Sequence, residues 1–448
     1  DHSLIIRLIL IFIKNYFFTI LMKVSFIGLG KLGLPVAVAI DAKGHNVLGY
    51  DINPNINSNK TPLQCLHTEE KNENLDGPIT SMLINSGVKF SDSLEECIKF
   101  GDIVFVAIQT PHDSKFGGQI PLTEEREDFN YTYLVNCVKE IGNVLDKLKM
   151  KKIVSIISTV LPGTLRSFIL PIISDNISLC YNPYFIAMGT VVNDFYNPEF
   201  ILLGRIDDDA ERELKQFYST ITNAPVFSTS LENAELIKVS YNTFITTKVV
   251  LINNLMEMCH HLPNTNIDEV SSALKLATKR LCSTSYLNGG MGDGGGCHPR
   301  DNIAMSWLSD RLGIKNNYYN FIMEKREDQS QFLANIVKDK KQELNLPVCI
   351  LGIAFKPETN LKDGSTALLL IEQLKEMNIE VESFDPYIND EEFIPKEKIY
   401  FLGCAHKIFN TYNFIKGSHV IDPHRYLRNI EGVTYTRIGI GPLANESV

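Results

Sequence analysis

Short apolar runs alternate with helical segments along the first part of the chain after Met22. Runs of this length and composition are typical of buried strands. Strands that alternate with helices predict a parallel sheet built from βαβ units. We therefore predict an α/β domain over 22–206, with strands at 24–29, 46–51, 103–108, 153–157 and 201–204.

After 206 the composition shifts towards helix-forming and acidic residues. From Leu231 the apolar positions recur with a 3.6-residue period as far as Cys259, which predicts one long helix. This helix belongs to a predicted central helical domain, 207–333. Residues 334–346 are predicted to form a connecting helix and linker.

Strands and helices alternate again in the last part of the chain, with strands at 347–356, 379–385 and 418–422 and a helix over 365–377. This pattern predicts a second, smaller α/β domain, 347–448, without a full glycine fingerprint. The predicted fold class is α/β, with two Rossmann-like, doubly wound domains joined by a central helical region that contains one long helix. From such a pair of domains we expect two nucleotide-like ligands that meet in the cleft between them.

The apolar stretch 4–21 raises the question of a membrane anchor or signal peptide. Arg7 and Lys14 interrupt it, and no uncharged run reaches the roughly 18 residues that a membrane span needs. We expect 1–21 to be a non-native leader, with Met22 as the natural start. A genuine anchor is the alternative.

Composition narrows the class of protein further. The net charge of −10 on 448 residues argues against a nucleic-acid binder. Nine cysteines without a C-x-x-C pair argue against a disulfide framework or a structural metal, and favour reduced thiols in the cytoplasm.

Three glycines follow the first predicted strand and precede a helix. In this context Gly28 allows a tight turn, Gly30 lets the backbone approach a pyrophosphate, and Gly33 permits close helix packing. Asp51 ends the second strand, where a carboxylate binds ribose hydroxyls and repels a 2′-phosphate. The pattern predicts NAD as the cofactor rather than NADP. The turn residues Lys31 and Leu32 are also predicted to contact it.

Two threonines end later strands of the same predicted sheet. Ligands of doubly wound sheets bind beyond the carboxyl ends of the strands, so Thr110 and Thr159 are candidate cofactor ligands. Either threonine could equally be a turn-forming residue before a proline.

The stretch 292–301 contains four glycines, then Cys297, a proline, an arginine and Asp301. A thiol in such a loop near cations that favour the thiolate can act as a covalent nucleophile. The alternative is a glycine-rich turn with an incidental small apolar residue.

On the predicted long helix, Glu235, Lys238 and Asn242 share one face. A lysine one turn from an amide can point at a single ligand. A solvated polar stripe is the alternative interpretation of the same spacing.

Taken together and in order, these motifs resemble the UDP-glucose/GDP-mannose dehydrogenase family nearly end to end from Met22. The matching segments are GLGKLGLP, the strand-end TP, STVLPGT, AELIKVSYN, GGGCHPRD, and GIAFKP with a later FDP. Members of that family oxidise the C6 alcohol of a nucleotide sugar to a carboxylate and use two NAD per turnover.

The resemblance implies roles for particular residues. Cys297 would form a thiohemiacetal and then a thioester, Lys238 with Asn242 would stabilise the oxyanion, Asp301 would assist proton transfer, and Thr159 would position water. The resemblance further implies a homodimer through the central helix. Arg280, one residue out of register, corresponds to the arginine that one subunit of the family's dimer contributes to the other. The residues expected to bind substrate are Tyr184, Phe185, Lys238, Asn242, Arg280, Tyr286, Gly294 and Lys356.

Three departures from the family pattern stand out. Tyr184 replaces an acid that assists acid/base chemistry, Asp293 stands where many members have Phe, and Asp363 stands at an arginine position. The predicted function is a cytoplasmic enzyme that acts on UDP-glucose or a UDP-N-acetylhexosamine. A silent nucleotide-sugar binder is the alternative that Tyr184 leaves open. A single-step 6-phosphogluconate or 3-hydroxyacid dehydrogenase is disfavoured, because it needs neither the cysteine loop nor the second α/β domain.

Overall fold

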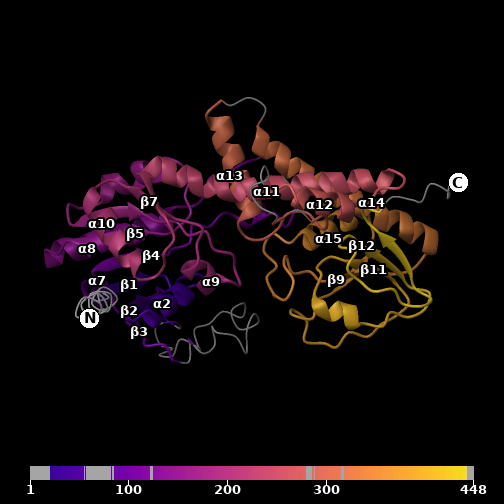
Figure 1. Cartoon of the computed structure of the whole chain (residues 1–448), viewed down its shortest axis with the longest axis horizontal. Coiled ribbons are helices and arrows are strands. Elements are labelled where there is room, and N and C mark those ends of the chain that lie inside the picture. Colours follow the sequence, from indigo (N-terminus) through magenta and orange to yellow (C-terminus); the bar gives the residue numbers. More distant parts are fainter. Residues whose placement is uncertain are drawn as a thin grey trace, which may run out of the picture. The chain divides into compact units, whose positions relative to one another are not determined.

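The computed structural model describes most of the chain, and Figure 1 shows its elements coloured by their position in the sequence. The prediction of a leader over 1–21 lies almost wholly outside the described residues, and Arg280 also lies outside them. The described residues are 21–54, 56, 82, 85–121, 125–278, 285–286, 288–313 and 317–440. They divide into two compact units, one from 1–110 with 131–236 and one from 111–130 with 237–448.

The first unit is built on an eight-stranded sheet in the order β3-β2-β1-β4-β5-β6-β7-β8. All neighbours are parallel except β6 and β7. The first six positions have the strand order of a dinucleotide-binding fold. The strands are β1 Lys23–Ile27, β2 Asn46–Tyr50, β3 Lys89–Phe90, β4 Ile103–Val106, β5 Lys152–Ile156, β6 Ile177–Tyr181, β7 Ile201–Arg205 and β8 Val226–Ser230.

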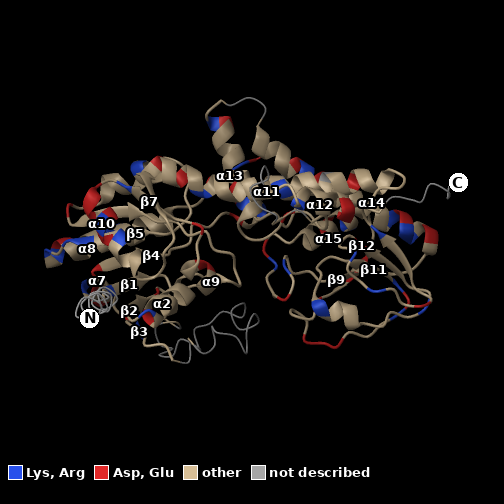
Figure 2. Ribbon diagram, in the orientation of Figure 1, with Lys and Arg blue, Asp and Glu red and all other residues tan. Residues whose placement is uncertain are grey.

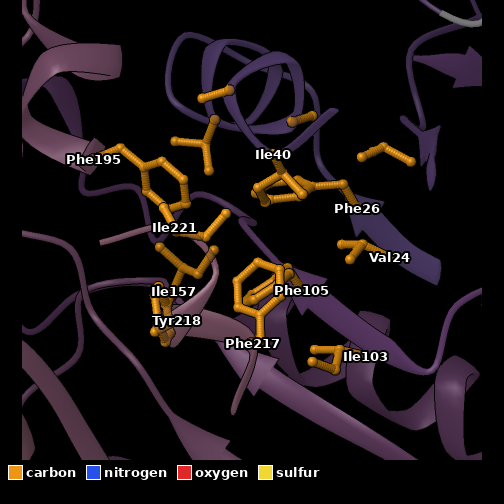
Figure 3. Close-up of a cluster of buried hydrophobic side chains, with 14 of the residues drawn as sticks. Val24, Phe26, Ile40, Ile103, Phe105, Ile157, Phe195, Phe217, Tyr218 and Ile221 are labelled. Atoms are coloured by element: carbon orange, nitrogen blue, oxygen red, sulfur yellow. The ribbon is translucent and has the colours of Figure 1, made fainter. Parts of the chain in front are cut away.

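Apolar side chains from three helices meet one face of this sheet. Figure 3 shows Phe26 and Phe105 of the sheet close to Ile40, Phe195 and Phe217, which come from α2, α9 and α10. The Phe26 and Phe105 ring centroids are 5.6 Å apart. The helical elements of this unit are α2 Gly33–Ala42, α7 Leu94–Phe100, α8 Thr132–Leu148, η2 Leu165–Ile169, η3 Leu170–Ile172, α9 Val191–Tyr196 and α10 Asp208–Ser219.

The second unit contains the helices expected in the centre of the chain. The long helix α11, Leu231–His261, is confirmed, and the boundary between the two units falls inside it. The segment predicted as a connecting helix and linker, 334–346, is mostly the end of a longer helix, α14. The other elements are η1 Ser114–Phe116, α12 Ile267–Lys275, α13 His298–Arg311 and α14 Tyr318–Leu344.

A five-stranded parallel sheet, in the order β10-β9-β11-β12-β13, completes the second unit. This is the strand order of the other common doubly wound fold, and the predicted fold class is confirmed. Ile252 and Met256 of α11 belong to the core of this sheet. Its elements are β9 Val348–Leu351, α15 Thr366–Glu376, β10 Val381–Phe384, β11 Ile399–Leu402, η4 Lys407–Thr411, β12 His419–Asp422 and β13 Thr434–Arg437.

The predicted domain boundary at 206 falls before elements that complete the first sheet. The acidic, helix-forming segment after 206 is α10, and β8 then pairs with β7. Both acidic and basic residues lie along α10 and α14 (Figure 2). Within the described part of the chain, no helix has the length and apolar character needed to cross a membrane.

Candidate active site

The glycine turn after β1 is shaped by close backbone contacts. Gly28 has a φ of +93°, and a Cβ there would lie 2.6 Å from the carbonyl oxygen of Ala107. A Cβ on Gly33 would lie 1.9 Å from the carbonyl oxygen of Gly28. Around Gly30, by contrast, no atom lies within 4 Å of the Cβ position, so its backbone is open to a ligand. Such an opening at the start of α2 suits a pyrophosphate.

Asp51 lies at the carboxyl end of β2, where it accepts hydrogen bonds from the glycine turn and from its own loop. The N–H of Leu29 donates to its Oδ2 at 2.7 Å, and the N–H of Asn53 donates to its Oδ1 at 2.8 Å. The sequence predicted a contact of Asp51 with the ribose, but it did not indicate that Asp51 also stabilises the glycine turn. Lys31 is exposed and Leu32 half-buried beside the turn. The open glycine and the carboxylate together fit NAD.

The two candidate threonines of the strand ends are in direct contact. The Thr110 hydroxyl donates to the carbonyl oxygen of Thr159 at 2.7 Å, so Thr110 holds the loop that carries Thr159. The same loop is held from its other side by the buried Glu235. This carboxylate accepts from the N–H groups of Gly163 at 2.6 Å and Leu165 at 2.8 Å. Burial raises the pKa of Glu235 to about 7.

Tyr184, which replaces the acid of the family, is part of a buried hydrogen-bonded group in the first unit. The Tyr218 hydroxyl donates to Asn182 Oδ1 and lies 3.2 Å from the Tyr184 hydroxyl. Burial raises the pKa of Tyr184 far above that of an ordinary phenol. With its pKa raised, the phenol stays protonated near neutral pH and is unsuited to act as a general base. The ring of Phe185 packs on Phe200 with centroids 4.8 Å apart.

Cys297 lies at the N-cap of α13 in the second unit, and its side chain is exposed. One turn further, Asp301 is fully buried. Its carboxylate accepts from Asn242 Nδ2 at 2.6 Å and from two nitrogens of Arg300 at 3.1 and 3.2 Å. The spacing of C-H-P-R-D on a helix thus brings an exposed thiol and a buried carboxylate to the same end of α13.

The polar face of α11 is buried, and the alternative of a solvated stripe is wrong. Glu235, Lys238 and Asn242 are 0%, 8% and 7% exposed. Burial lowers the pKa of Lys238, while the negative charges of Asp301 and of the Cys297 thiolate act in the opposite direction. Lys238 thus interacts electrostatically with both groups.

The glycines of the cysteine loop leave room for a neighbouring loop. A Cβ on Gly294 would lie 3.0 Å from the carbonyl oxygen of Gly364, and one on Gly295, where φ is +92°, 3.0 Å from the ring of Phe355. Lys356 follows on this second loop and is half-buried. Asp363 is exposed on it, with its Cβ 3.8 Å from the Cβ position of Gly296.

Arg326 of α14 was missed by the sequence reasoning. It is 1% exposed and donates to three backbone carbonyls from separate segments: Asp293 at 2.6 Å, Gly118 at 3.1 Å and Gly364 at 3.2 Å. An arginine in a helical pattern carries no signal of such a role, because its partners are backbone atoms distant in sequence. Tyr286, with a φ of 61°, is exposed before the cysteine loop.

The comparisons with known proteins agree with this arrangement. The family model for the NAD-binding domain of the UDP-glucose/GDP-mannose dehydrogenases matches residues 22–222, and the model for their central domain matches 232–327. UDP-glucose 6-dehydrogenase of Rickettsia bellii is 28% identical to this chain over 403 residues, which cover 87% of each protein. GDP-mannose 6-dehydrogenase of Pseudomonas putida is 25% identical over 380 residues, 81% of each.

A solved structure of UDP-glucose dehydrogenase from Pyrobaculum islandicum shares the fold. It has a TM-score of 0.79 at 21% identity and covers 95% of this chain and 99% of its own. The two family models span most of the sequence, and the glycine turn with Asp51 fits the cofactor. The chain therefore belongs to the UDP-glucose/GDP-mannose dehydrogenase family and is an NAD-dependent nucleotide-sugar 6-dehydrogenase.

Proposed function

We propose that the chain oxidises the C6 alcohol of UDP-glucose or of a UDP-N-acetylhexosamine to the carboxylate, with Cys297 as the nucleophile. The observation that supports this most directly is the surroundings of the thiol. Cys297 is exposed at the start of α13, and it interacts electrostatically with the buried Lys238, which also interacts with Asp301. A thiolate near a cation is an activated nucleophile.

The proposed reaction consists of two oxidations, and NAD supplies the hydride acceptor for each. In the first, the C6 hydroxyl loses its proton and the C6 carbon loses a hydride, which gives an aldehyde. The Cys297 thiolate then adds to the aldehyde carbon and forms a thiohemiacetal, whose loss of hydride gives a thioester. Water attacks the thioester, the carbon–sulfur bond breaks, and the thiol and the carboxylate are released.

Other residues of the chain would orient and neutralise these groups. A buried Lys238 is suited to stabilising the oxyanion that forms when the thiolate adds, because a charge acts more strongly away from water. Asp301, which accepts from Asn242, is proposed to assist proton transfer. Thr159 remains the proposed water-positioning residue, and Lys356, Phe185, Tyr286 and Gly294 remain proposed substrate contacts.

Replacement of the nucleophile tests this proposal. Cys297→Ser keeps a similar shape but offers a hydroxyl that hardly ionises and a poor leaving group. The first oxidation needs no sulfur, so we expect steady turnover to be abolished while NADH still forms at about one equivalent or less per site. Rapid mixing followed by mass measurement of the intact protein would detect this and any trapped ester.

The matched control is Cys137→Ser, on a half-buried cysteine of α8, which should keep full turnover. Unimpaired multiple turnover by Cys297→Ser would show that the thiol is only a small residue in a glycine turn. No NADH from the wild type with any nucleotide sugar would instead favour the silent binder, for which Tyr184 is the supporting feature.

A panel of nucleotide sugars tests the substrate. The Rickettsia relative is named a UDP-glucose 6-dehydrogenase and the Pseudomonas relative a GDP-mannose 6-dehydrogenase, so both nucleotides belong in the panel. We expect NADH formation with UDP-glucose or a UDP-N-acetylhexosamine. A higher kcat/KM with GDP-mannose would contradict the proposed substrate class.

We also propose that the enzyme is a homodimer formed through α11. Phe244, Leu251 and Met258 are spaced by seven residues on this helix and are 52%, 55% and 51% exposed. Apolar residues at this spacing form one stripe along a helix, as at a helix–helix seam. The same stripe on a second copy would cover it, because a two-fold interface pairs a surface with itself.

The cytoplasm is the proposed location. The seven cysteines within the described part of the chain are all free thiols. Free, largely buried thiols suit a reducing compartment.

A further inference from the structure

Three strand ends lie together at the carboxyl edge of the second sheet, where β10, β9 and β11 are neighbours. The loop after β9 carries Lys356, the proposed substrate contact. Asp385 follows β10, and His406 follows β11 at the start of η4. Both of these side chains are 0% exposed. Neither of them has a role in the reaction proposed above.

Asp385 fixes the first turn of the loop after β9. Its Oδ2 accepts from the N–H groups of Ile353 at 2.8 Å and Ala354 at 2.9 Å, and its Oδ1 accepts from the N–H of Tyr387 at 2.9 Å. Burial alone would raise the pKa of Asp385, but the hydrogen bonds that it accepts from His406 and from backbone N–H groups lower it. Asp385 is therefore an ionised acceptor at neutral pH.

His406 holds the same loop further along. The N–H of Glu358 donates to its Nδ1 at 2.9 Å, and its Nε2 lies 3.1 Å from Asp385 Oδ2. A backbone N–H can only donate, so Nδ1 is unprotonated and the imidazole proton lies on Nε2, which donates to the carboxylate. Both ring nitrogens of a neutral imidazole are thus engaged. His406 links the end of β10 to the loop after β9.

Glu358 is the point at which this loop turns. Its φ of 62° lies in the left-handed region, which a residue with a side chain adopts only where its surroundings hold it. Its carboxylate accepts from the Tyr387 hydroxyl at 2.6 Å and from the N–H of Lys407 at 2.7 Å. Two residues earlier, the carbonyl oxygen of Lys356 accepts from the Thr359 hydroxyl at 3.0 Å. The imidazole therefore fixes the backbone at the turn that follows Lys356.

We propose that His406 positions Lys356 for the anionic part of the nucleotide sugar, through the hydrogen bond from the Glu358 N–H to its Nδ1. The proposal rests on the proposed function, in which Lys356 is a substrate contact. A loop that is already held in its binding conformation binds more tightly than one that must be ordered on binding. His406 acts through the lysine and is a positioning residue. No bond is made or broken at the imidazole.

Two substitutions separate the two contacts of the imidazole. The side-chain oxygen of His406→Asn can take the place of Nδ1 and accept from Glu358. The amide nitrogen of His406→Gln can instead take the place of Nε2 and donate to Asp385. Both variants lose the packing of the imidazole on the ring of Tyr387, where the centroids are 4.7 Å apart. A difference between the two variants therefore reports the hydrogen bond to Glu358.

The probe is UDP, which both proposed substrates contain, and its Kd is measured by titration calorimetry on the full chain. We expect His406→Gln to weaken UDP binding by about 3- to 10-fold, the effect of one hydrogen bond, and His406→Asn to weaken it by less than about 2-fold. Amide hydrogen exchange of the peptide 353–358 should be faster in His406→Gln and close to wild type in His406→Asn.

The matched control is His419→Gln, on a histidine that is 5% exposed at the amino end of β12. Its ring nitrogens lie 2.7 Å from the Thr434 hydroxyl and 2.9 Å from the Thr436 hydroxyl. This variant also loses a buried, hydrogen-bonded imidazole from the second sheet, but at the opposite edge. It should change neither the Kd for UDP nor the exchange of the peptide 353–358.

A double variant tests whether His406 acts through Lys356. Lys356→Met removes the charge and should itself weaken UDP binding. If the histidine acts through the lysine, His406→Gln should add little to that loss, whereas the two losses would add if the roles were independent. The Kd for NAD should stay the same in every variant, because the glycine turn that fits NAD belongs to the first unit.

Equal UDP affinity, or equal exchange, in the wild type and His406→Gln would overturn the proposal. So would a His406→Asn variant as impaired as His406→Gln, or losses that add in the double variant. Failure of the proposed function has a different signature: Lys356→Met would bind UDP as tightly as the wild type, while the exchange of 353–358, which needs no ligand, would still show whether His406 holds the loop. A wild type that binds GDP and not UDP would correct the substrate class, and GDP would then be the probe for the same comparison.

Discussion

Asp51 has two separate tasks at the end of β2. Its Oδ2 holds the glycine turn through the N–H of Leu29 at 2.7 Å, and we expect its negative charge to oppose a 2′-phosphate. We expect kcat/KM to be at least about 100-fold higher with NAD than with NADP. Asp51→Asn retains an acceptor for Leu29 but loses the charge, so the preference should narrow by about 10-fold or more.

The measurement is kcat/KM with each cofactor at fixed nucleotide sugar. Asp102→Asn, on a carboxylate that accepts from the N–H of Lys23, serves as the control and should leave the preference unchanged. Equal turnover of the wild type with both cofactors would contradict the discriminating role of Asp51.

Lys238 is expected to matter most in the transition state. It is buried and interacts with both Asp301 and Cys297. Lys238→Ala should therefore lower kcat by about 100-fold or more, while KM for the nucleotide sugar changes much less. Lys147→Ala, on an exposed lysine of α8, is the control. A variant with normal kcat and only a raised KM would assign Lys238 to substrate binding alone.

Residue types and spacing were enough to place the glycine turn at Gly28 and a carboxylate beside it at Asp51, because both are constrained by local backbone; Cys297 stays a prediction. They could not show that Tyr184 would meet Tyr218, or that Thr110 would hold the Thr159 carbonyl. Those contacts join residues 34 and 49 positions apart. Such partners are decided by the packing of the sheet, which local patterns do not contain.

At the scale of elements, the loop 158–165 is tied to α11 by one buried carboxylate. Glu235 accepts from two N–H groups of this loop, and burial raises its pKa from 4.5 to about 7. The folded protein therefore binds this proton more tightly than the unfolded chain does. Stability from this group is greatest below pH 4.5 and is lost as the pH rises towards 7 and above.

Glu235→Gln removes this titration. Between pH 5 and 8 the wild type should lose about 2–3 kcal/mol of unfolding free energy relative to the variant. The measurement is the difference between their thermal midpoints at each pH, with Glu213→Gln, on a half-buried glutamate of α10, as the control. A difference that does not change with pH would mean that Glu235 is not protonated on folding.

The helical period correctly placed Glu235, Lys238 and Asn242 on one face, but it could not show that this face is buried. A polar stripe has the same spacing whether water or protein covers it. The pattern also missed the full length of α14. Ile322 and Met323 are buried near its start, but the buried residues that follow are the polar Arg326, Gln329 and Ser330, and the apolar period resumes only at Leu333 and Val337.

For the whole molecule, alternation of strands and helices was sufficient to predict two doubly wound sheets. It could not show that residues 111–130, which lie between β4 and α8 in the sequence, group with the second unit. There Phe116 packs with Ile303 of α13 and Met323 of α14. A short segment of this kind has no hydrophobic periodicity that would assign it to one unit or the other.

The proposed homodimer depends on the apolar stripe of α11. The Thr247 hydroxyl lies 2.7 Å from the Tyr318 hydroxyl, so the start of α14 lies beside this stripe and adds Tyr318 and Phe321, which are 48% and 56% exposed. Leu251 lies in the middle of the stripe. A charge at this position would be buried without a partner in a dimer but would stay solvated in a monomer.

We therefore expect the wild type to sediment as a dimer of the 50.5 kDa chain and Leu251→Glu to sediment as a monomer. Leu276→Glu, on a leucine that is 83% exposed after α12, is the matched control and should remain dimeric. Circular dichroism should be the same for all three, because Leu251 is solvent-exposed in the single chain. A monomeric wild type at assay concentrations, or a dimeric Leu251→Glu, would show that α11 does not form the interface.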